Sequence, residues 1–343
     1  MKIKKIFSLA LTILFVGAIA LFIIFKAKEP SLEISTIYAM DTVMTFSVYS
    51  GKSFDATKAC TKEIERLDDM LSTGKESSEV SRLNQEKDIK VSSDTLLLLE
   101  ESKNIYDLTD GAFNVAVYPL MEAWGFAGGN FRVPEKSEIE DLTQIVNNPQ
   151  IQCLREKSEV ILGESTKIDL GGIAKGYAGD CLIEILKNNG VKSAMLNLGG
   201  NVAALGYKED GTPWVVGINS PAGNGELLGK VSVTDKAVVT SGGYERFFEE
   251  EGIVYHHIID PNTGYPAESG VESVTIITEK GIYADALSTS LFVMGLEKAT
   301  GLYKKSPVPF EFVLLTDEDK LYVTEGLKGS FSSEKEICYI SKK

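Results

Sequence analysis

The 343-residue sequence has few of the residues on which many metal and thiol sites depend: two histidines and four cysteines. The histidines are neighbours, His256 and His257, and no spaced Cys or Glu pattern completes a tetrahedral zinc site with them. The cysteines lie far apart and follow no metal or redox spacing: Cys60, Cys153, Cys181 and Cys338. We therefore expect neither a zinc site nor a catalytic cysteine.

Basic residues are also scarce. The chain carries 35 Lys and Arg against 49 Asp and Glu. Five of the lysines and one of the glutamates lie in the first 30 residues, so the remainder has 30 basic and 48 acidic residues and a net charge of −18. Such a chain lacks the basic face that binds nucleic acid, and it is not drawn flat onto anionic lipid.

No Pro-, Ser- or Gly-rich linker, charge block or fixed-period repeat divides the chain after residue 30, so we predict one domain over residues 31–343. Residues 1–30 form a separate element, in which three lysines precede 20 uncharged residues from Ile6 to Phe25. This run can span a bilayer, with the lysines in the cytoplasm. The pattern predicts an uncleaved transmembrane anchor in the cell membrane, with the domain outside the cytoplasm. A cleaved signal peptide is the alternative, although it usually has a shorter apolar run and a small-residue cleavage site.

Hydrophobic periodicity predicts four long helices, at Asp55–Leu71, Thr95–Leu108, Ile173–Leu186 and Tyr283–Tyr303. Alternation predicts strands at Thr42–Tyr49, Trp214–Ile218, Lys230–Val233, Val254–Ile259 and Ser273–Thr278, and a hairpin of Phe312–Thr316 with Leu321–Thr324. The strands cluster without regular βαβ alternation, which favours an α+β fold.

Asp285 and Thr289 lie four residues apart in the apolar helical segment from Tyr283 to Met294, hence on one helix face. A buried carboxylate is costly unless it is paired or bound to a metal. A carboxylate and a hydroxyl oxygen side by side form the kind of oxygen site that Mg²⁺ takes. The alternative is that Asp285 caps the helix and Thr289 bonds back to a carbonyl.

Two further segments point to phosphate chemistry. Lys167 to Ala178 reads as strand, glycine turn and helix, and a helix N-terminus behind paired glycines favours anions, although a simple tight turn is the alternative. Tyr255 to Pro266 reads as a short strand that carries both histidines into a Pro/Gly turn. Successive strand residues face opposite ways, so one histidine would enter a site, where it would serve as a general base.

Nine segments, in order, match one known family: Ala39–Thr42, Leu71–Thr73, Asp110–Asn114, Pro119–Phe126, Ile168–Ala178, Leu198–Asn201, Thr240–Arg246, His257–Pro266 and Ala284–Thr289. On these segments the chain, from about Ile37 to Tyr322, resembles the FAD:protein FMN transferases of the ApbE family. The resemblance implies a T-fold-like α+β domain.

The resemblance also implies an activity, namely Mg²⁺-dependent transfer of FMN from FAD to a threonine hydroxyl of an extracytoplasmic acceptor flavoprotein. The reaction would form a phosphoester and release AMP. Two alternatives remain: an FAD pyrophosphatase that makes FMN and AMP with water in place of threonine, and a non-enzymatic surface flavin-binding protein that needs no metal.

Residue by residue, the resemblance places Mg²⁺ on Asp285, Thr289 and the carbonyl of Gly172, and it makes His257 the base that accepts the threonine proton. It places FAD against Met40, Ala112, Phe113, Asn114, Asp169, Lys175 and the backbone of Ile259. Two positions depart from the family pattern. Gly74 stands where some relatives have an aromatic residue, and Asn114 stands where many have aspartate. Both concern substrate preference and not the reaction class.

Overall fold

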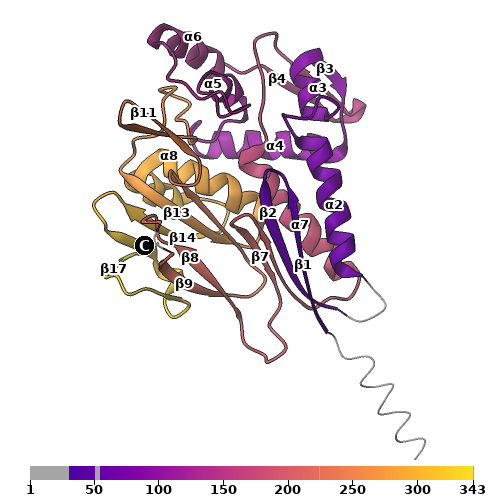
Figure 1. The fold of residues 1–343 in the computed structure, drawn as a ribbon, viewed down its shortest axis with the longest axis vertical. Coiled ribbons are helices and arrows are strands. Elements are labelled where there is room, and N and C mark those ends of the chain that lie inside the picture. The colour runs from indigo at the N-terminus through magenta and orange to yellow at the C-terminus, as the bar shows by residue number, and fades with distance from the viewer. Residues whose placement is uncertain (1–30, 51–54, 224, 343) are drawn as a thin grey trace, which may run out of the picture.

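The computed structural model describes residues 31–50, 55–223 and 225–342. Figure 1 shows strands and helices in separate layers, so the predicted α+β class is confirmed. The predicted anchor at residues 1–30 lies outside the described residues. Among the residues that are described, no helix has both the length and the apolar character needed to cross a membrane.

The largest sheet in the described part of the chain has nine strands. In spatial order they are β1 (Ser31–Ala39), β2 (Thr42–Ser50), β6 (Ser193–Leu198), β7 (Asn201–Leu205), β10 (Ala237–Gly242), β13 (Val271–Thr278), β14 (Glu311–Thr316), β15 (Leu321–Thr324) and β17 (Ile337–Ile340). Neighbouring strands run antiparallel except β15 and β17, which are parallel. Antiparallel neighbours need only tight turns, which explains the hairpins β1–β2, β6–β7 and β14–β15.

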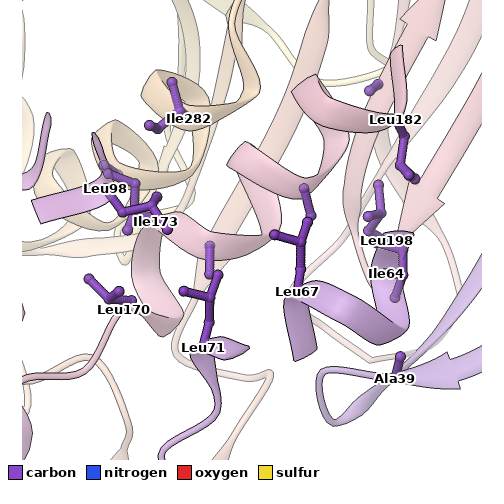
Figure 2. Packing of buried hydrophobic residues seen from close by; sticks show 14 of the residues in the cluster. Ala39, Ile64, Leu67, Leu71, Leu98, Leu170, Ile173, Leu182, Leu198 and Ile282 are labelled. Atoms are coloured by element: carbon purple, nitrogen blue, oxygen red, sulfur yellow. The ribbon is translucent and has the colours of Figure 1, made fainter. Parts of the chain in front are cut away.

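One face of this sheet is covered by helices. They are α2 (Ala56–Leu71), α7 (Gly171–Asn188) and α8 (Gly281–Lys305), and α4 (Ser93–Leu108) packs against α7 and α8. Figure 2 shows apolar side chains of all four meeting in one core, with Leu67, Leu98, Ile173 and Ile282 among them. Along the central strands alternate residues point to these helices. The helix side of the sheet is therefore where side chains from β10 can meet α8.

A small sheet covers part of the opposite face. It consists of β16 (Phe331–Ser332), β9 (Leu227–Val233) and β8 (Trp214–Asn219). Every second residue of β8, beginning with Trp214, is buried. These side chains pack against residues of the large sheet such as Val238, Ile277 and Val313. The large sheet thus has an apolar layer on each face.

The remaining elements lie together beyond one end of the large sheet, at the top of Figure 1. The sheet β3 (Asp88–Lys90), β5 (Glu159–Leu162) and β4 (Ile151–Leu154) adjoins α3 (Glu79–Glu86). The helices α5 (Tyr118–Ala123) and α6 (Lys136–Val146) pack together around Leu120 and Trp124. The hairpin β11 (Phe247–Glu250) and β12 (Ile253–His256) contacts this second group through its aromatic side chains.

The four predicted helices are confirmed to within two residues at each end. Asp55 is the N-cap of α2, where its carboxylate accepts a hydrogen bond from the N–H of Lys58, and so it stands just outside the helix. Helix α8 consists of two helical segments that meet at a kink at Gly295, whose φ is 75°. Only a residue without a side chain adopts such a conformation readily.

Two strand predictions are wrong in part. The strand predicted over Val254–Ile259 ends at His256, because Ile259 instead forms an isolated bridge with Pro266. The strand expected before the glycine turn at Gly171 is absent: residues 166–170 have no regular structure. The side-chain amide of Asn84 takes the place of a partner strand there, since it accepts from the N–H of Ile168 (2.7 Å) and donates to its carbonyl (2.8 Å).

Candidate active site

The first turn of α7 forms one side of the site. The Oδ1 atom of Asp169 accepts a hydrogen bond from the N–H of Gly171 (2.8 Å), which fixes the turn into the helix. Burial raises the pKa of the Asp169 carboxyl, and this hydrogen bond and the charges of Lys175 and Arg246 oppose the change. The Nζ atom of Lys175 lies 3.4 Å from the carbonyl oxygen of Gly171. A lysine therefore stands at the helix N-terminus that the sequence predicts for phosphate.

Where helices α7 and α8 cross, a carboxylate from each helix accepts hydrogen bonds from backbone N–H groups of the other. Asp285 of α8 is buried, with 4% of its surface exposed, and its Oδ2 accepts a hydrogen bond from the N–H of Gly176 in α7 (2.8 Å). In the other direction, Asp180 of α7 accepts from the N–H groups of Gly281 (2.8 Å) and Ile282 (3.1 Å) at the start of α8. Asp285 therefore caps no end of its own helix, and the alternative assigned to it from sequence is wrong.

The hydrogen bond between Asp285 and Gly176 affects the backbone carbonyl of Gly172. In a regular α-helix the N–H of Gly176 donates to the carbonyl of Gly172, four residues earlier. The carboxylate of Asp285 competes for that donor. The aromatic ring of Phe113 lies over Gly172, where an added Cβ would be 3.2 Å from the Cε2 atom of Phe113. The two glycines thus admit a carboxylate and an aromatic ring close to the helix backbone.

Thr289 lies one turn after Asp285 and beside the end of β10. Its Oγ1 is 3.4 Å from the Oγ of Ser241, which shares a shorter hydrogen bond of 2.7 Å with the Oγ of Ser288. The hydroxyl of Ser288 donates a hydrogen bond to the carbonyl of Asp285 (2.8 Å). The alternative from sequence gave such a bond to Thr289, but Ser288 forms it instead. Thr289 therefore keeps its hydroxyl oxygen close to the sheet and on the same helix face as Asp285.

His257 approaches from the hairpin β11–β12. Its Nδ1 atom is 3.1 Å from the carbonyl oxygen of Arg246, and its backbone N–H donates to the same oxygen (3.0 Å). A carbonyl can only accept, so we assign the proton to Nδ1, which leaves the lone pair of Nε2 available to a substrate. Burial lowers the pKa of His257 to about 4, and the charge of Arg246 adds to this. The imidazole is therefore neutral, as a base must be, at ordinary pH.

His256 faces the other way, as strand alternation predicts. Its Nε2 is 3.2 Å from the carbonyl oxygen of Ala267, and its ring packs edge-on against Phe292 at 5.4 Å. The ring of His257 instead lies 6.3 Å from that of Phe126. The two neighbours therefore belong to different surroundings, and His257 is the one near the charged groups of α7.

Glu245 and Arg246 complete the charged surroundings. Burial by the surrounding protein raises the pKa of the Glu245 carboxyl to about 6, with Lys175 opposing and Asp285 adding to the shift, although part of the side chain remains exposed. The guanidinium of Arg246 donates to the carbonyl of Phe126 (2.8 Å). Lys175 and Arg246 thus place two cations near both His257 and Asp169, an arrangement suited to a pyrophosphate.

The other residues predicted to hold FAD differ in their surroundings. Asn114 uses its side chain within the fold, donating to the carbonyl of Val146 (2.9 Å) and accepting from the N–H of Ala116 (2.9 Å). Ala112 and Phe113 are buried beside it. Met40 has a positive φ of 48°, and its N–H donates to Asp68 of α2 (3.2 Å). In the described part of the chain, Met40 forms no hydrogen bond with Asp169, Lys175, Arg246 or His257.

Ile259 is placed so that its backbone can contact a ligand. Two backbone hydrogen bonds flank the Ile259–Pro266 bridge. The N–H of Asp260 donates to the carbonyl of Tyr265 (2.9 Å), and the N–H of Ala267 donates to the carbonyl of Ile258 (2.9 Å). In an antiparallel pair flanked in this way, the N–H and C=O of the central residue point away from its partner. The bridge to Pro266 therefore does not use the N–H and C=O groups of Ile259.

The oxygen atoms around Asp285 suit a magnesium ion. The Asp285 carboxylate is buried and forms no ion pair with any described residue, so a cation would offset its charge. The described residues hold no group of three His, Cys, Asp or Glu side chains that could bind a metal alone. A metal here would therefore need hydroxyl, carbonyl and substrate oxygens besides Asp285, which is the habit of Mg²⁺.

The sequence reasoning named no role for Ser241, Glu245, Arg246 or Gly176. All four lie inside segments that carried the family resemblance, and two of them are charged residues in a glycine-containing segment, which is a signal in itself. All four cysteines are unpaired, and burial raises the pKa of Cys60 to about 12. A cavity of about 350 Å³ at the opposite end of β10, lined by Lys236 and Thr278, contains none of the site residues.

Known proteins with a similar sequence and fold are flavin transferases. The model of the ApbE family matches residues 40–313. The sequence is 33% identical to the FAD:protein FMN transferase of Vibrio cholerae over 279 residues, which are 78% of this chain and 82% of the relative. It is also 33% identical to the enzyme of that name from Treponema pallidum over 288 residues, or 78% and 80% of the two chains.

Solved structures are similar over most of their length. The crystal structure of the ApbE protein from Thermotoga maritima matches with a TM-score of 0.81 and 33% identity, covering 89% of this chain and 100% of that one. The apo form of the flavinyl transferase ApbE from Pseudomonas stutzeri matches with a TM-score of 0.78 and 27% identity, covering 90% and 99%. These relatives define the chain as an enzyme that transfers a flavin. The chain belongs to the ApbE family, and the resemblance found in its sequence is confirmed.

Proposed function

We propose that this enzyme transfers FMN from FAD to a threonine hydroxyl of an acceptor protein outside the cytoplasm, with Mg²⁺ held by Asp285, Thr289 and the carbonyl of Gly172. The observation that carries the proposal is the orientation of His257, whose Nδ1 is engaged by the carbonyl of Arg246 while Nε2 is left for an incoming hydroxyl. Neutral imidazole next to two cations is a suitable base for a reaction at a phosphate.

The reaction exchanges one P–O bond for another. The threonine oxygen bonds to the phosphorus of the FMN half of FAD, the P–O bond to the AMP phosphate breaks, and AMP leaves. The threonine proton passes to Nε2 of His257 and then to solvent. Phosphoryl transfer relies mainly on positioning and on neutralising charge. Lys175 and Arg246 are placed to orient the pyrophosphate, and bound Mg²⁺ would offset further negative charge on its oxygens.

The test is incubation of the full chain with FAD, Mg²⁺ and an extracytoplasmic acceptor domain that carries an exposed threonine. We expect the intact mass of the acceptor to rise by one FMN phosphoester, with release of AMP in equal amount, and we expect chelation of Mg²⁺ to stop both. An acceptor with its threonine replaced by valine is the control. Production of FMN and AMP without labelled acceptor would identify a pyrophosphatase instead.

The location outside the cytoplasm rests on the sequence of residues 1–30. If the apolar run from Ile6 to Phe25 is an uncleaved anchor, protein extracted from membranes keeps Met1 or Lys2 at its N-terminus. N-terminal sequencing tests this. A mature chain that starts near residue 27 or later would show a cleaved signal peptide.

A further inference from the structure

The edge strand β1 has a partner on only one side of its backbone. In the described part of the chain it is the terminal strand of the nine-stranded sheet, and it pairs with β2 alone, in unbroken register. Figure 1 shows it in indigo beside β2. On the helix side of the sheet, Ile37 of β1 is half-buried, whereas Met44 and Phe46 of β2 are fully buried. Strand β1 therefore extends past the helix layer, and its outer edge is open.

The turn after β1 determines which backbone groups face this edge. Met40 and Asp41 have φ values of 48° and 58°, so they form a type I′ turn between Ala39 and Thr42. The two residues that flank such a turn exchange hydrogen bonds, and every second residue along β1 repeats this pattern with β2. The N–H and C=O groups of the residues in between point to the open edge. These residues are Leu32, Ile34, Thr36 and Tyr38.

The same residues also have exposed side chains on the outer face of the sheet. Leu32 is 45% exposed, Ile34 65% and Tyr38 72%. Strand β1 has no lysine, proline or bulge, the features that usually protect an edge strand from pairing. The opposite edge strand, β17, has only four residues and lies between Lys335 and Lys342. A long, regular edge strand with exposed apolar side chains, such as β1, is a surface with which another strand can pair.

We propose that β1 forms a dimer interface, and that its occupant is β1 of a second copy of this chain in antiparallel orientation. One two-fold register pairs the outward N–H and C=O groups of all four residues. It places Ser35 opposite its own symmetry mate. Leu32 then lies opposite Tyr38 of the second copy, and Ile34 lies opposite Thr36. Pairs of an aliphatic residue with an aromatic or β-branched residue stabilise neighbouring strands.

The charge of β1 also suits pairing with itself. Glu33 is the only charged residue of the strand. In the two-fold register it lies opposite Ile37 of the second copy, so the two glutamates do not face each other. Like charges directly opposite would destabilise the pair. Strand β1 is therefore complementary to itself in shape, hydrogen bonding and charge.

The chain that precedes β1 favours a second copy as well. The apolar run that we propose as an anchor ends at Phe25, and six residue steps lead from there to Ser31. Six steps of extended chain span about 20 Å, so each copy would hold β1 close to the same bilayer surface. Tethering in one plane raises the effective concentration of one strand at another. This argument rests on the proposed anchor, whereas the open edge does not depend on it.

Two exposed residues on neighbouring strands provide a matched test. Ile34 of β1 is 65% exposed and Val43 of β2 is 59% exposed on the same face, but only Ile34 lies in the pairing strand. Sedimentation equilibrium of the full chain in detergent should show a monomer–dimer equilibrium. Ile34→Lys should raise the Kd of the dimer about tenfold or more, because a lysine on an edge strand opposes pairing. Val43→Lys should leave the Kd within about threefold of the wild-type value, since it lies away from the edge.

Disulfide formation tests the register. Ser35→Cys should give a covalent dimer on mild oxidation, because the Cα atoms of such a pair are about 4.5 Å apart. Tyr38→Cys is the control, since its symmetry mates would lie about 20 Å apart along the strands. It should give no more covalent dimer than the wild type with its four unpaired cysteines.

Three results would overturn the inference. One is a wild-type chain that stays monomeric at every concentration measured. Another is an equal Kd for Ile34→Lys and Val43→Lys, which would assign the contact to the outer face or to another part of the chain. The third is covalent dimer from Tyr38→Cys but not from Ser35→Cys. None of these results bears on transfer of FMN, so the proposed function stands or falls separately.

Discussion

Gly176 of α7 and Gly281 of α8 meet backbone to backbone. A Cβ atom added to Gly176 would lie 2.1 Å from the carbonyl oxygen of Gly281, and one added to Gly281 would lie 2.3 Å from that of Gly176. No side chain fits at either position. The approach brings Asp285 within hydrogen-bond reach of α7 and Asp180 within reach of α8. The position of the candidate metal ligand therefore depends on the absence of two side chains.

The first prediction tests this helix contact. Gly176→Ala should lower the free energy of unfolding by about 1–3 kcal/mol, because the added methyl group has to push the two backbones apart. Gly301→Ala in α8 is the matched control, since a Cβ there meets nothing within 4 Å. It should be neutral or stabilise the protein by up to about 1 kcal/mol. Thermal melting followed by circular dichroism measures both, and equal melting temperatures would contradict the packing argument.

The second prediction concerns the metal. Asp285→Ala and Thr289→Ala should each sharply reduce transfer, and Asp285→Ala should be the more severe because it removes a charge as well as a ligand. The measurement is the single-turnover transfer rate as a function of Mg²⁺ concentration. Near-normal transfer by Asp285→Ala at limiting Mg²⁺ would show that the metal does not bind there.

Asp180→Ala is the control for this measurement. It removes the other carboxylate of the same helix crossing and leaves the N–H groups of Gly281 and Ile282 without their partner. Unpaired buried donors cost about 1–3 kcal/mol each, so this variant should lose stability. Its dependence on Mg²⁺ should nonetheless match that of the wild type, which separates loss of the metal from loss of helix packing.

The third prediction separates the two histidines. His257→Asn should leave FAD affinity largely intact and reduce transfer about 10²–10⁴-fold, the usual effect of losing a general base. His256→Asn should cost stability, through its contacts with Ala267 and Phe292, and little activity. FAD affinity from fluorescence quenching and single-turnover rates decide the matter. Equal impairment of both variants, or parallel loss of FAD binding in His257→Asn, would make His257 a structural residue.

The fourth prediction is a pH dependence of stability. Burial lowers the pKa of His257 to about 4, whereas in the unfolded chain it is about 6.5. As pH falls through this window the unfolded chain binds the proton before the folded one does, so folding loses stability. The melting temperature of the wild type, relative to His257→Asn, should therefore fall on acidification from about pH 7 to pH 4. A constant difference over that range would contradict the burial of a neutral imidazole.

Glu245 gives the opposite sign and so a fifth prediction. Burial raises the pKa of its carboxyl from 4.5 to about 6, so the folded chain takes up this proton first. Its contribution to stability is present at low pH and is lost as pH rises through the interval from 4.5 to 6. Relative to Glu245→Gln, the wild type should therefore lose melting temperature as pH rises from about 4 to about 7. A constant difference would show that the pKa of Glu245 is not raised, and a difference that rises with pH would show that it is lowered.

The four long helices α2, α4, α7 and α8 could be predicted from sequence because apolar residues recur in each at helical spacing. The shorter helices α3, α5 and α6 were not predicted. The central strands β7 and β10 could not be predicted. All five residues of β7, from Asn201 to Leu205, are buried, so no alternation of polar and apolar residues marks them. The end of β12 was also missed. Ile258 and Ile259 continue the apolar pattern, but they leave the ladder to form the turn that presents His257.

The candidate site could be found from sequence only as separate pieces. The spacing of Asp285 and Thr289 places them on one helix face, and that much needs no structure. The partner of Asp285 is Gly176, 109 residues earlier, and no local pattern connects them. Likewise the assignment of Nε2 of His257 as the base follows from the carbonyl of Arg246, which only the hairpin geometry brings there.

The reciprocal hydrogen bonds of Asp285 and Asp180 between α7 and α8 have an evolutionary consequence. One oxygen of Asp285 is committed to the backbone of Gly176, so selection for metal chemistry and selection for folding act on the same side chain. A substitution at position 285 is therefore opposed by selection for metal chemistry and by selection for folding. A substitution of Asp180 is opposed only by selection for folding. Descendants that lose the transfer activity should therefore keep a hydrogen-bond acceptor at 285 longer than they keep the hydroxyl of Thr289.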